Sequence, residues 1–270
     1  MSVVPTGRKP MEAIWTRLVI EPVAGRVIRL LVPWSAATPN RVTVVAGLLA
    51  LCSATAFGTG HLVVGAIVFQ IRFLVDCLDG RLARIRGTAT AWGGALDLIA
   101  DVVGITLNYA ALATYLVAAD AAPPLLLSAV IASNGVYVWT LSQRKSIPGG
   151  DQHDWSREAV ADTGGGGSPR ARLVRFMARH GMVPTPYAVE IEACALTLAP
   201  LTVLLMPAGQ TYTIAVAGLW LASVFYVVAS ALNVYRTWRL TSAIDLAGVG
   251  GRDPAPAGRS GEKVTPHRSR

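Results

Sequence analysis

The sequence predicts an all-α, polytopic membrane protein of about six transmembrane helices, preceded by an amphipathic helix at the membrane interface. Of its 270 residues, 53% are hydrophobic and only 15% are charged. The apolar residues gather in runs of about 20, the length that an α-helix needs to cross the hydrocarbon core of a bilayer. The turns between these runs alternate between rich and poor in Lys and Arg, as in a multi-pass chain. This composition excludes an ordinary water-soluble domain.

Residues 11–34 form the first predicted helix, and they are amphipathic rather than apolar throughout. Apolar residues recur near the helical period, arginines lie between them, and tryptophans stand near the two ends, at Trp15 and Trp34. This pattern is typical of a helix that lies in the headgroup layer of a membrane. The alternative is a buried helix that covers the bundle.

Six apolar segments follow, and turn signals separate them. Thr38-Pro39 suits a helix N-terminus, and Gly58-Thr59-Gly60 suits a tight turn. We expect transmembrane helices at about 41–58, 61–84, 91–119, 125–142, 187–206 and 211–235.

A polar loop at residues 143–186 separates the fourth span from the fifth, and a short basic helix is expected inside it from Arg170 to His180. Residues 1–240 then form a single transmembrane catalytic domain. Residues 241–270 are rich in Gly, Pro and charge, so we expect a disordered cytoplasmic tail.

The placement of positive charge predicts the topology. Lys and Arg occur before the first span, between the second and third, in the 143–186 loop and after the sixth, whereas the other three turns contain none. Positively charged loops stay in the cytoplasm, so we expect a cell-membrane protein whose termini and second-to-third turn are cytoplasmic. This topology accounts for the net charge of +8. Because aromatic residues do not alternate with the basic ones, nucleic acid is not an expected partner.

Four carboxylates flank the turn between the second and third spans, two on each side. Asp76 and Asp79 are three residues apart, and Asp97 and Asp101 are four apart, so each pair lies on one face of its helix. In a poorly hydrated setting these carboxylates repel one another unless a positive charge lies among them. Oxygen ligands without Cys or His favour Mg²⁺ or Mn²⁺ over zinc. The residues therefore indicate metal-assisted phosphoryl transfer.

The spacing of the aspartates extends to neighbouring residues, in the pattern Asp76-x2-Asp79-Gly80-x2-Ala83-Arg84-x8-Gly93-x3-Asp97-x3-Asp101. This pattern resembles the complete signature of the CDP-alcohol phosphotransferase family of integral membrane enzymes, with every position filled and every spacer at the expected length. The resemblance implies a CDP-alcohol phosphatidyltransferase of phospholipid biosynthesis.

By this resemblance, an acceptor hydroxyl attacks the β-phosphorus of a CDP-alcohol, most commonly CDP-diacylglycerol, and CMP is released. The resemblance implies that the four aspartates hold two Mg²⁺ or Mn²⁺ ions and that Asp97 and Asp101 are catalytic, with Asp101 as candidate general base. It implies close packing of the second and third spans at Gly93, and a homodimer in which each protomer carries its own site. It also implies a nucleotide site formed by Asn40, Asp79, Gly80, Ala83 and Arg84. For Asn40 the alternative is helix capping.

Two other interpretations of the aspartates are weighed against this one. They could be structural, paired with nearby arginines (Arg81, Arg84 and Arg86), but such pairing requires neither Gly80 nor Ala83. They could form a proton relay in a transporter, but transporters usually show repeats or broken helices, and the sequence shows neither. Arg72, about one turn before Asp76, is expected to face the polar site.

The motif leaves the acceptor alcohol open. Family members that use a phosphorylated acceptor usually add basic residues on the fourth and fifth spans, whereas the fifth span here begins with Glu190 and Glu192 and has no arginine. Arg144 and Lys145, at the end of the fourth span, and the loop arginines remain candidates for a phosphate site. A neutral or cationic acceptor, or a CDP-amino alcohol donor with a lipid acceptor, is equally compatible with the motif. We expect one of the two glutamates to face the cavity; the alternative is that both extend to the cytoplasmic surface.

Overall fold

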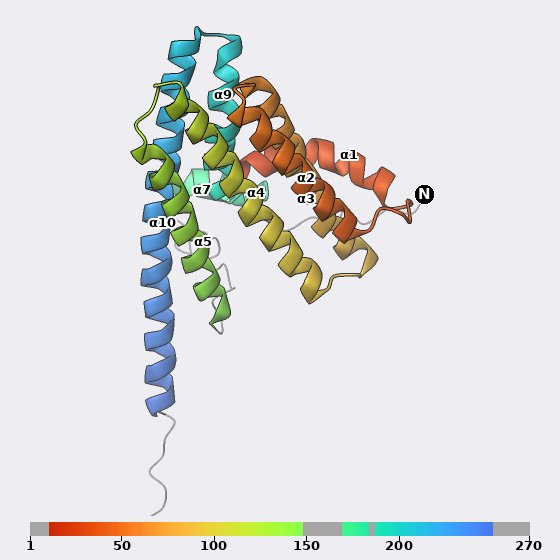
Figure 1. Cartoon of the computed structure of the whole chain (residues 1–270). Coiled ribbons are helices and arrows are strands. Elements are labelled where there is room, and N and C mark those ends of the chain that lie inside the picture. Colours follow the sequence, from red (N-terminus) through yellow and green to blue (C-terminus); the bar gives the residue numbers. More distant parts are fainter. Residues whose placement is uncertain (1–10, 148–168, 184–186, 251–270) are drawn as a thin grey trace, which may run out of the picture.

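The computed structural model describes residues 11–147, 169–183 and 187–250, and these residues are helical apart from turns and one isolated β-bridge (Figure 1). The predicted all-α class is therefore confirmed. The long helices are α2 (Pro39–Gly58), α3 (Leu62–Arg86), α4 (Ala91–Ala118), α5 (Leu125–Ser146) and α10 (Ala208–Gly250). The shorter elements are η1 (Thr16–Ile20), α1 (Glu21–Leu31), α7 (Pro169–Arg179), α8 (Ala188–Ala193), η2 (Cys194–Leu198), α9 (Ala199–Leu201) and η3 (Thr202–Leu204).

Four of the described helices are long and apolar enough to cross a membrane: α2, α4, α5 and residues 208–244 of α10. Helix α3 has the length, but Arg72, Asp76 and Asp79 make it more polar than these four. The predicted fifth span is divided into α8, η2, α9 and η3, and Pro200 in α9 has no backbone N–H to donate. Length and composition thus support four of the six predicted spans.

Apolar side chains cover the outside of these helices. Leu48 on α2 is 57% exposed and Val228 on α10 is 53% exposed, and both have many apolar neighbours of similar exposure. A soluble monomer rarely presents so large an apolar surface to water, whereas lipid chains solvate it at little cost. The outer surface is therefore that of a membrane protein.

Helix α2 is central to the N-terminal half, because it packs along both α3 and α4, which make few direct contacts with each other. The Ser53 hydroxyl of α2 donates a hydrogen bond to the Gly65 carbonyl of α3 at 2.8 Å. The Asn108 amide of α4 donates to the Ala50 carbonyl of α2 at 3.1 Å. Small residues and single polar contacts of this kind hold helices together in lipid, where apolar burial supplies little drive.

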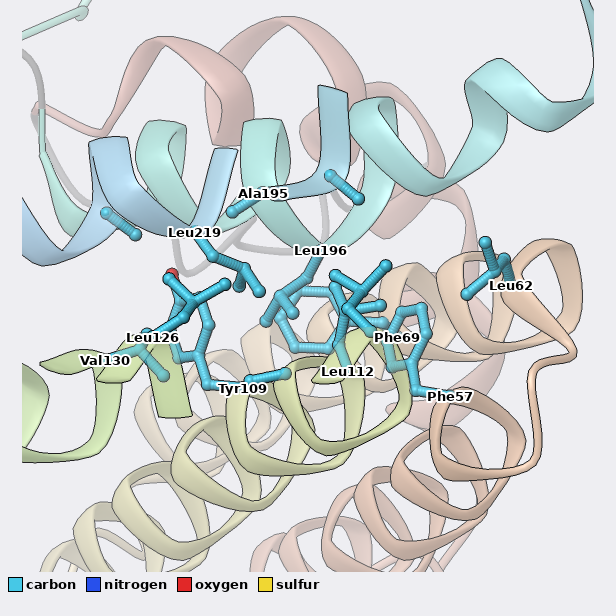
Figure 2. Packing of buried hydrophobic residues seen from close by; sticks show 14 of the residues in the cluster. Phe57, Leu62, Phe69, Tyr109, Leu112, Leu126, Val130, Ala195, Leu196 and Leu219 are labelled. Atoms are coloured by element: carbon cyan, nitrogen blue, oxygen red, sulfur yellow. The ribbon is translucent and has the colours of Figure 1, made fainter. Parts of the chain in front are cut away.

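One buried cluster joins the two halves of the bundle. It takes side chains from α2, α3, α4, α5, η2 and α10, and Figure 2 shows Leu196 of η2 among Phe69 of α3 and Leu112 of α4. At the same level, the ring of Tyr109 on α4 meets the ring of Tyr226 on α10 edge to face, with centroids 6.0 Å apart. Helix α10 is thereby brought beside α4, which carries two of the aspartates.

The N-terminal helix is attached to α3 by a buried ion pair. Glu21 of α1 and Arg81 of α3 are each 2% exposed and share two hydrogen bonds. Removal of one member of such a pair typically costs about 3–5 kcal/mol, because the other charge stays buried alone. Ile28 of α1 is also buried, whereas Leu30 is 74% exposed. One face of α1 covers the bundle while the opposite face carries exposed apolar residues, and its position in the headgroup layer stays a prediction.

One difference from the predicted boundaries concerns the C-terminal tail, which was expected to be disordered. Helix α10 continues to Gly250, so the first ten residues of the tail predicted from residue 241 are helical. The rest of that tail and residues 148–168 of the predicted loop lie outside the described residues. Helix α7 agrees with the short basic helix expected inside the loop.

Candidate active site

Three aspartates from two helices converge to one point. Asp76 comes from α3, and Asp97 and Asp101 come from α4; one carboxylate oxygen of each lies within 4.8 Å of the others. Oxygens bound to a single hard cation lie at most about 4–5 Å apart, twice a metal–oxygen distance of roughly 2.0–2.5 Å. The three carboxylates are therefore placed to share one cation.

The charges around this group favour a cation as well. Oδ1 of Asp76 is buried and accepts no hydrogen bond within the described part of the chain. Arg72, 1% exposed, is hydrogen-bonded to Asp101, and its Nη2 lies 3.7 Å from Asp76 Oδ1. The prediction that Arg72 faces the polar site is thus confirmed. One guanidinium among three carboxylates leaves an excess of negative charge, so this oxygen-only donor set fits Mg²⁺ or Mn²⁺.

The arginines that could have made the aspartates purely structural are engaged elsewhere. Arg81 is paired with Glu21 and lies 3.4 Å from Glu12. Arg86 donates hydrogen bonds to the carbonyls that end α1, among them Leu31 and Val32 at 3.0 Å each. Neither supplies a counter-charge to Asp76, so the structural interpretation loses two of its three proposed partners.

Asp79 has a different environment from the other three aspartates. One of its oxygens accepts a hydrogen bond from the Thr43 hydroxyl of α2, and the other accepts one from the Gly80 backbone N–H. It lies outside the three-carboxylate group. Sequence reasoning missed Thr43; the available signal was its position three residues after Asn40, on the same face of the first span.

A pocket beside Asp79 contains every residue assigned to the nucleotide site. Its lining comes from α2, α3, α4 and the turn before α4, and includes Asn40, Asp79, Gly80, Ala83, Arg84, Gly93 and Asp97. A Cβ on Gly80 would stand 3.2 Å from Nη1 of Arg84, so the guanidinium lies directly over bare helix surface. A phosphate bound there would meet a fixed positive charge without a side chain in between.

The prediction that Gly93 brings the second and third spans together is wrong. A Cβ on Gly93 would stand 3.2 Å from the side-chain oxygen of Asn40, which belongs to the first span. Helix α2 lies close to the start of α4, whereas α3 and α4 make few contacts. Gly93 therefore makes room for Asn40 at the pocket. Asn40 does not cap its helix, because Thr38 fills that role with a bond from the Arg41 N–H at 3.4 Å.

A second, larger cavity lies on the other side of the aspartates. Its volume is about 490 Å³, and residues of α3, α4, α5 and α8 line it. Half of the lining residues are apolar, and the polar ones are Arg72, Asp101, Asn134, Tyr137, Ser142, Lys145, Ser146 and Glu192. Asp97 lines the first pocket and Asp101 the second, so the carboxylate group stands between two cavities.

The two glutamates of the fifth predicted span have separate roles. Glu192 lines the larger cavity and accepts a hydrogen bond from the Tyr226 hydroxyl of α10 at 3.2 Å. Glu190 accepts backbone N–H bonds from Tyr187 at 2.8 Å and from Trp15 at 3.2 Å. The expectation that one glutamate faces the cavity is confirmed. Tyr226 was missed because nothing in the sequence of α10 indicates which of its faces meets α8.

The basic residues considered for a phosphate site also differ in whether they line the larger cavity. Lys145 lines the larger cavity, but its side chain is exposed. Arg144 is buried and donates to the side-chain oxygen of Asn233 on α10 at 3.1 Å. Among the described side chains, Arg172, Arg175 and Arg179 of α7 line neither cavity.

Comparison with known proteins identifies the class to which this site belongs. Residues 36–155 match the model of the CDP-alcohol phosphatidyltransferase family. This segment carries all four aspartates, so the resemblance to that family of phosphotransferases expected from their spacing is confirmed. The match agrees with the four described helices that are long and apolar enough to span a membrane.

Individual relatives point in the same direction. The chain is 35% identical over 124 residues to the phosphatidylinositol phosphate synthase of Corynebacterium glutamicum, covering 46% of this chain and 52% of the relative. It is 34% identical over 98 residues to the archaetidylinositol phosphate synthase of Methanothermobacter thermautotrophicus, covering 33% and 46%. The chain thus spans about half the length of the curated relatives it matches.

A solved structure shares the fold. The crystal structure of Mycobacterium tuberculosis phosphatidylinositol phosphate synthase in complex with manganese and citrate matches with a TM-score of 0.50. The match covers 82% of this chain and 89% of that chain at 21% sequence identity, a likeness that shows a common fold.

Proposed function

We propose that this chain is a CDP-alcohol phosphatidyltransferase of phospholipid biosynthesis. It transfers the phosphatidyl group of CDP-diacylglycerol to the hydroxyl of a small polar acceptor and releases CMP. The observation that carries this proposal is the convergence of Asp76, Asp97 and Asp101 between two cavities. The residues assigned to the nucleotide line one cavity, and Asp101 lines the other.

In this proposal, Asp76, Asp79, Asp97 and Asp101 hold two Mg²⁺ or Mn²⁺ ions. Bound divalent cations neutralise a diphosphate and stabilise the departing phosphate of CMP. The crystal structure of similar fold was determined with manganese, which agrees with this choice of metal.

The residues of the chain then have distinct tasks. Asn40, Gly80, Ala83 and Arg84 hold the cytidine diphosphate group, with Arg84 against its phosphates. Asp101 accepts the proton of the acceptor hydroxyl as that oxygen bonds to the β-phosphorus and the bond to CMP breaks. Its side chain is 36% exposed, against 12% for Asp76, so it is the more accessible of the two to an acceptor.

The reaction itself supplies the first test. The purified chain in detergent with Mg²⁺ should release CMP from CDP-diacylglycerol when a panel of small alcohols is added, and mass spectrometry of the lipids should show the matching phosphatidyl product. Release of CMP only from a CDP-amino alcohol, with diacylglycerol as acceptor, would favour the alternative donor. Absence of CMP with every donor and acceptor pair would contradict the proposed chemistry.

The proposal places the site at the cytoplasmic surface of the cell membrane, with six spans and both termini inside. Helix α3 and the segment from α8 to η3 are the two further spans, and the distribution of Lys and Arg sets the direction. The homodimer that the resemblance implies is part of the same proposal.

Labelling of single cysteines checks this orientation. In a chain whose three cysteines are replaced by alanine, a membrane-impermeant thiol reagent added to intact cells should label Gln210→Cys and should fail to label Arg179→Cys. Both positions are exposed, so burial cannot account for a difference. Labelling of Arg179→Cys alone would place the site on the opposite side of the membrane.

A further inference from the structure

The larger cavity contains a buried carboxylate that belongs neither to the aspartate group nor to a helix cap. Glu192 is 7% exposed, and its Oε1 accepts the hydroxyl of Tyr226. The Tyr226 oxygen lies 3.3 Å from the hydroxyl of Tyr109, and both tyrosines are fully buried. The Tyr226 hydroxyl donates its one proton to Glu192, so Tyr109 is the donor in its hydrogen bond with Tyr226. Two buried tyrosines thus hold the carboxylate in place.

The other charged side chains that line the cavity leave the charge of Glu192 available to a ligand. Among the described residues that line it, the charged side chains are Arg72, Asp101, Lys145 and Glu192. Arg72 and Asp101 are hydrogen-bonded to each other and offset one another. Lys145 is exposed, so water screens its charge, whereas Glu192 is enclosed. Close to Glu192, the enclosed charge that a ligand meets is therefore negative.

The surroundings of Glu192 suit a positively charged group. Tyr137 lines the same cavity, and its ring packs against that of Tyr226 with centroids 5.1 Å apart. A carboxylate beside an aromatic ring is a common receptor for ammonium groups, through charge and cation–π attraction. A phosphate in the same place would face an enclosed like charge, which costs several kcal/mol.

We propose, on the basis of the phosphatidyltransferase function above, that Glu192 is a specificity-determining residue. The acceptor that it selects is a small alcohol bearing an ammonium group and no phosphate. The carboxylate binds the ammonium in the larger cavity, and the acceptor hydroxyl is presented to Asp101, which lines the same cavity. This assignment differs from the phosphorylated acceptor indicated by the names of the curated relatives.

Acceptor kinetics test the proposal. CMP release from CDP-diacylglycerol is measured with ethanolamine, L-serine, myo-inositol, myo-inositol 1-phosphate and glycerol 3-phosphate. The wild-type chain should use an ammonium-bearing acceptor at least about tenfold better in kcat/KM than a phosphorylated one. Glu192→Gln should raise the KM of that acceptor about tenfold, the usual size of a lost charged hydrogen bond, with the KM of CDP-diacylglycerol nearly constant.

Two further variants separate specificity from structure. Glu192→Asp keeps the charge and should retain the preference for ammonium, whereas Glu190→Gln, two residues away and outside the cavity, should leave the acceptor KM unchanged. Monodisperse elution of each variant in detergent shows that it is folded. If Glu192 only balanced the charge of Arg72, Glu192→Gln would lower kcat for all acceptors alike and leave the ratio between them unchanged.

The outcomes also distinguish a failure of the Glu192 proposal from a failure of the proposed phosphatidyltransferase function. CMP release that is fastest with myo-inositol 1-phosphate, or an ammonium-acceptor KM that Glu192→Gln does not change, would overturn the role of Glu192 and leave the phosphatidyltransferase function standing. If none of the acceptors led to CMP release, both proposals would be overturned.

Discussion

Chelation of divalent cations should reduce CMP release by this chain to the background rate. Asp76, Asp97 and Asp101 bring three carboxylate oxygens within 4.8 Å of one another, with Arg72 as their buried cationic neighbour. A metal in such a site supplies several kcal/mol of transition-state stabilisation. Because each 1.4 kcal/mol corresponds to about tenfold in rate, a loss of at least about 10³-fold is expected.

The measurement compares turnover before and after dialysis against excess EDTA, and then after addition of Mg²⁺ or Mn²⁺, which should restore it. A readout without substrate accompanies it: either cation should raise the melting temperature of the wild-type chain, because a ligand that binds the folded state stabilises it. Undiminished turnover in excess chelator would end the two-metal proposal.

Asp97→Asn should lower kcat by at least about 10²-fold, the typical effect of removing one group that stabilises transition-state charge. Asp97 belongs to the three-carboxylate group and also lines the pocket proposed for the nucleotide, so it connects the two parts of the site. Asparagine has nearly the same size but carries no charge, so the packing of α4 is preserved while an anionic ligand is lost. The variant should also lose most of the metal-dependent rise in melting temperature.

Asp120→Asn is the matched control. Asp120 is exposed in the turn after the same helix, with a φ of 53°. Asparagine adopts that left-handed conformation readily, so the substitution removes one negative charge without strain. Its kinetics should match those of the wild type. If Asp76→Asn, Asp79→Asn and Asp97→Asn all retained substantial activity, the aspartate pattern would have no catalytic role here.

Features that depend on neighbouring residues were predictable from the sequence. Thr38 caps α2 as expected, and Gly60 occupies a left-handed turn with a φ of 81°. The i, i+4 spacing of Asp97 and Asp101 placed both on one face of α4, and the structure joins them to Asp76. These features follow from the helical period and from the conformational range of single residues, which do not require knowledge of the rest of the chain.

The arrangement of the helices was not predictable in the same way. The sequence placed Gly93 between the second and third spans, but α2 packs against both α3 and α4, so Gly93 faces Asn40 instead. Asp79 accepts a hydrogen bond from Thr43 of α2 for the same reason. These neighbours depend on which faces of apolar helices meet, and nearly uniform apolar surfaces leave several such pairings open.

The sequence by itself determined which class of chemistry to expect, because the helical spacing of the four aspartates, with Gly80, Ala83 and Arg84 beside them, is a local feature. Only the tertiary structure decided which glutamate enters the larger cavity. Glu190 and Glu192 point about 200° apart on a helix of roughly 100° per residue, so one of them must turn away from it. Packing of α8 against α10 places Glu192 at Tyr226, a contact 34 residues apart in sequence that depends on how two helices are rotated against each other.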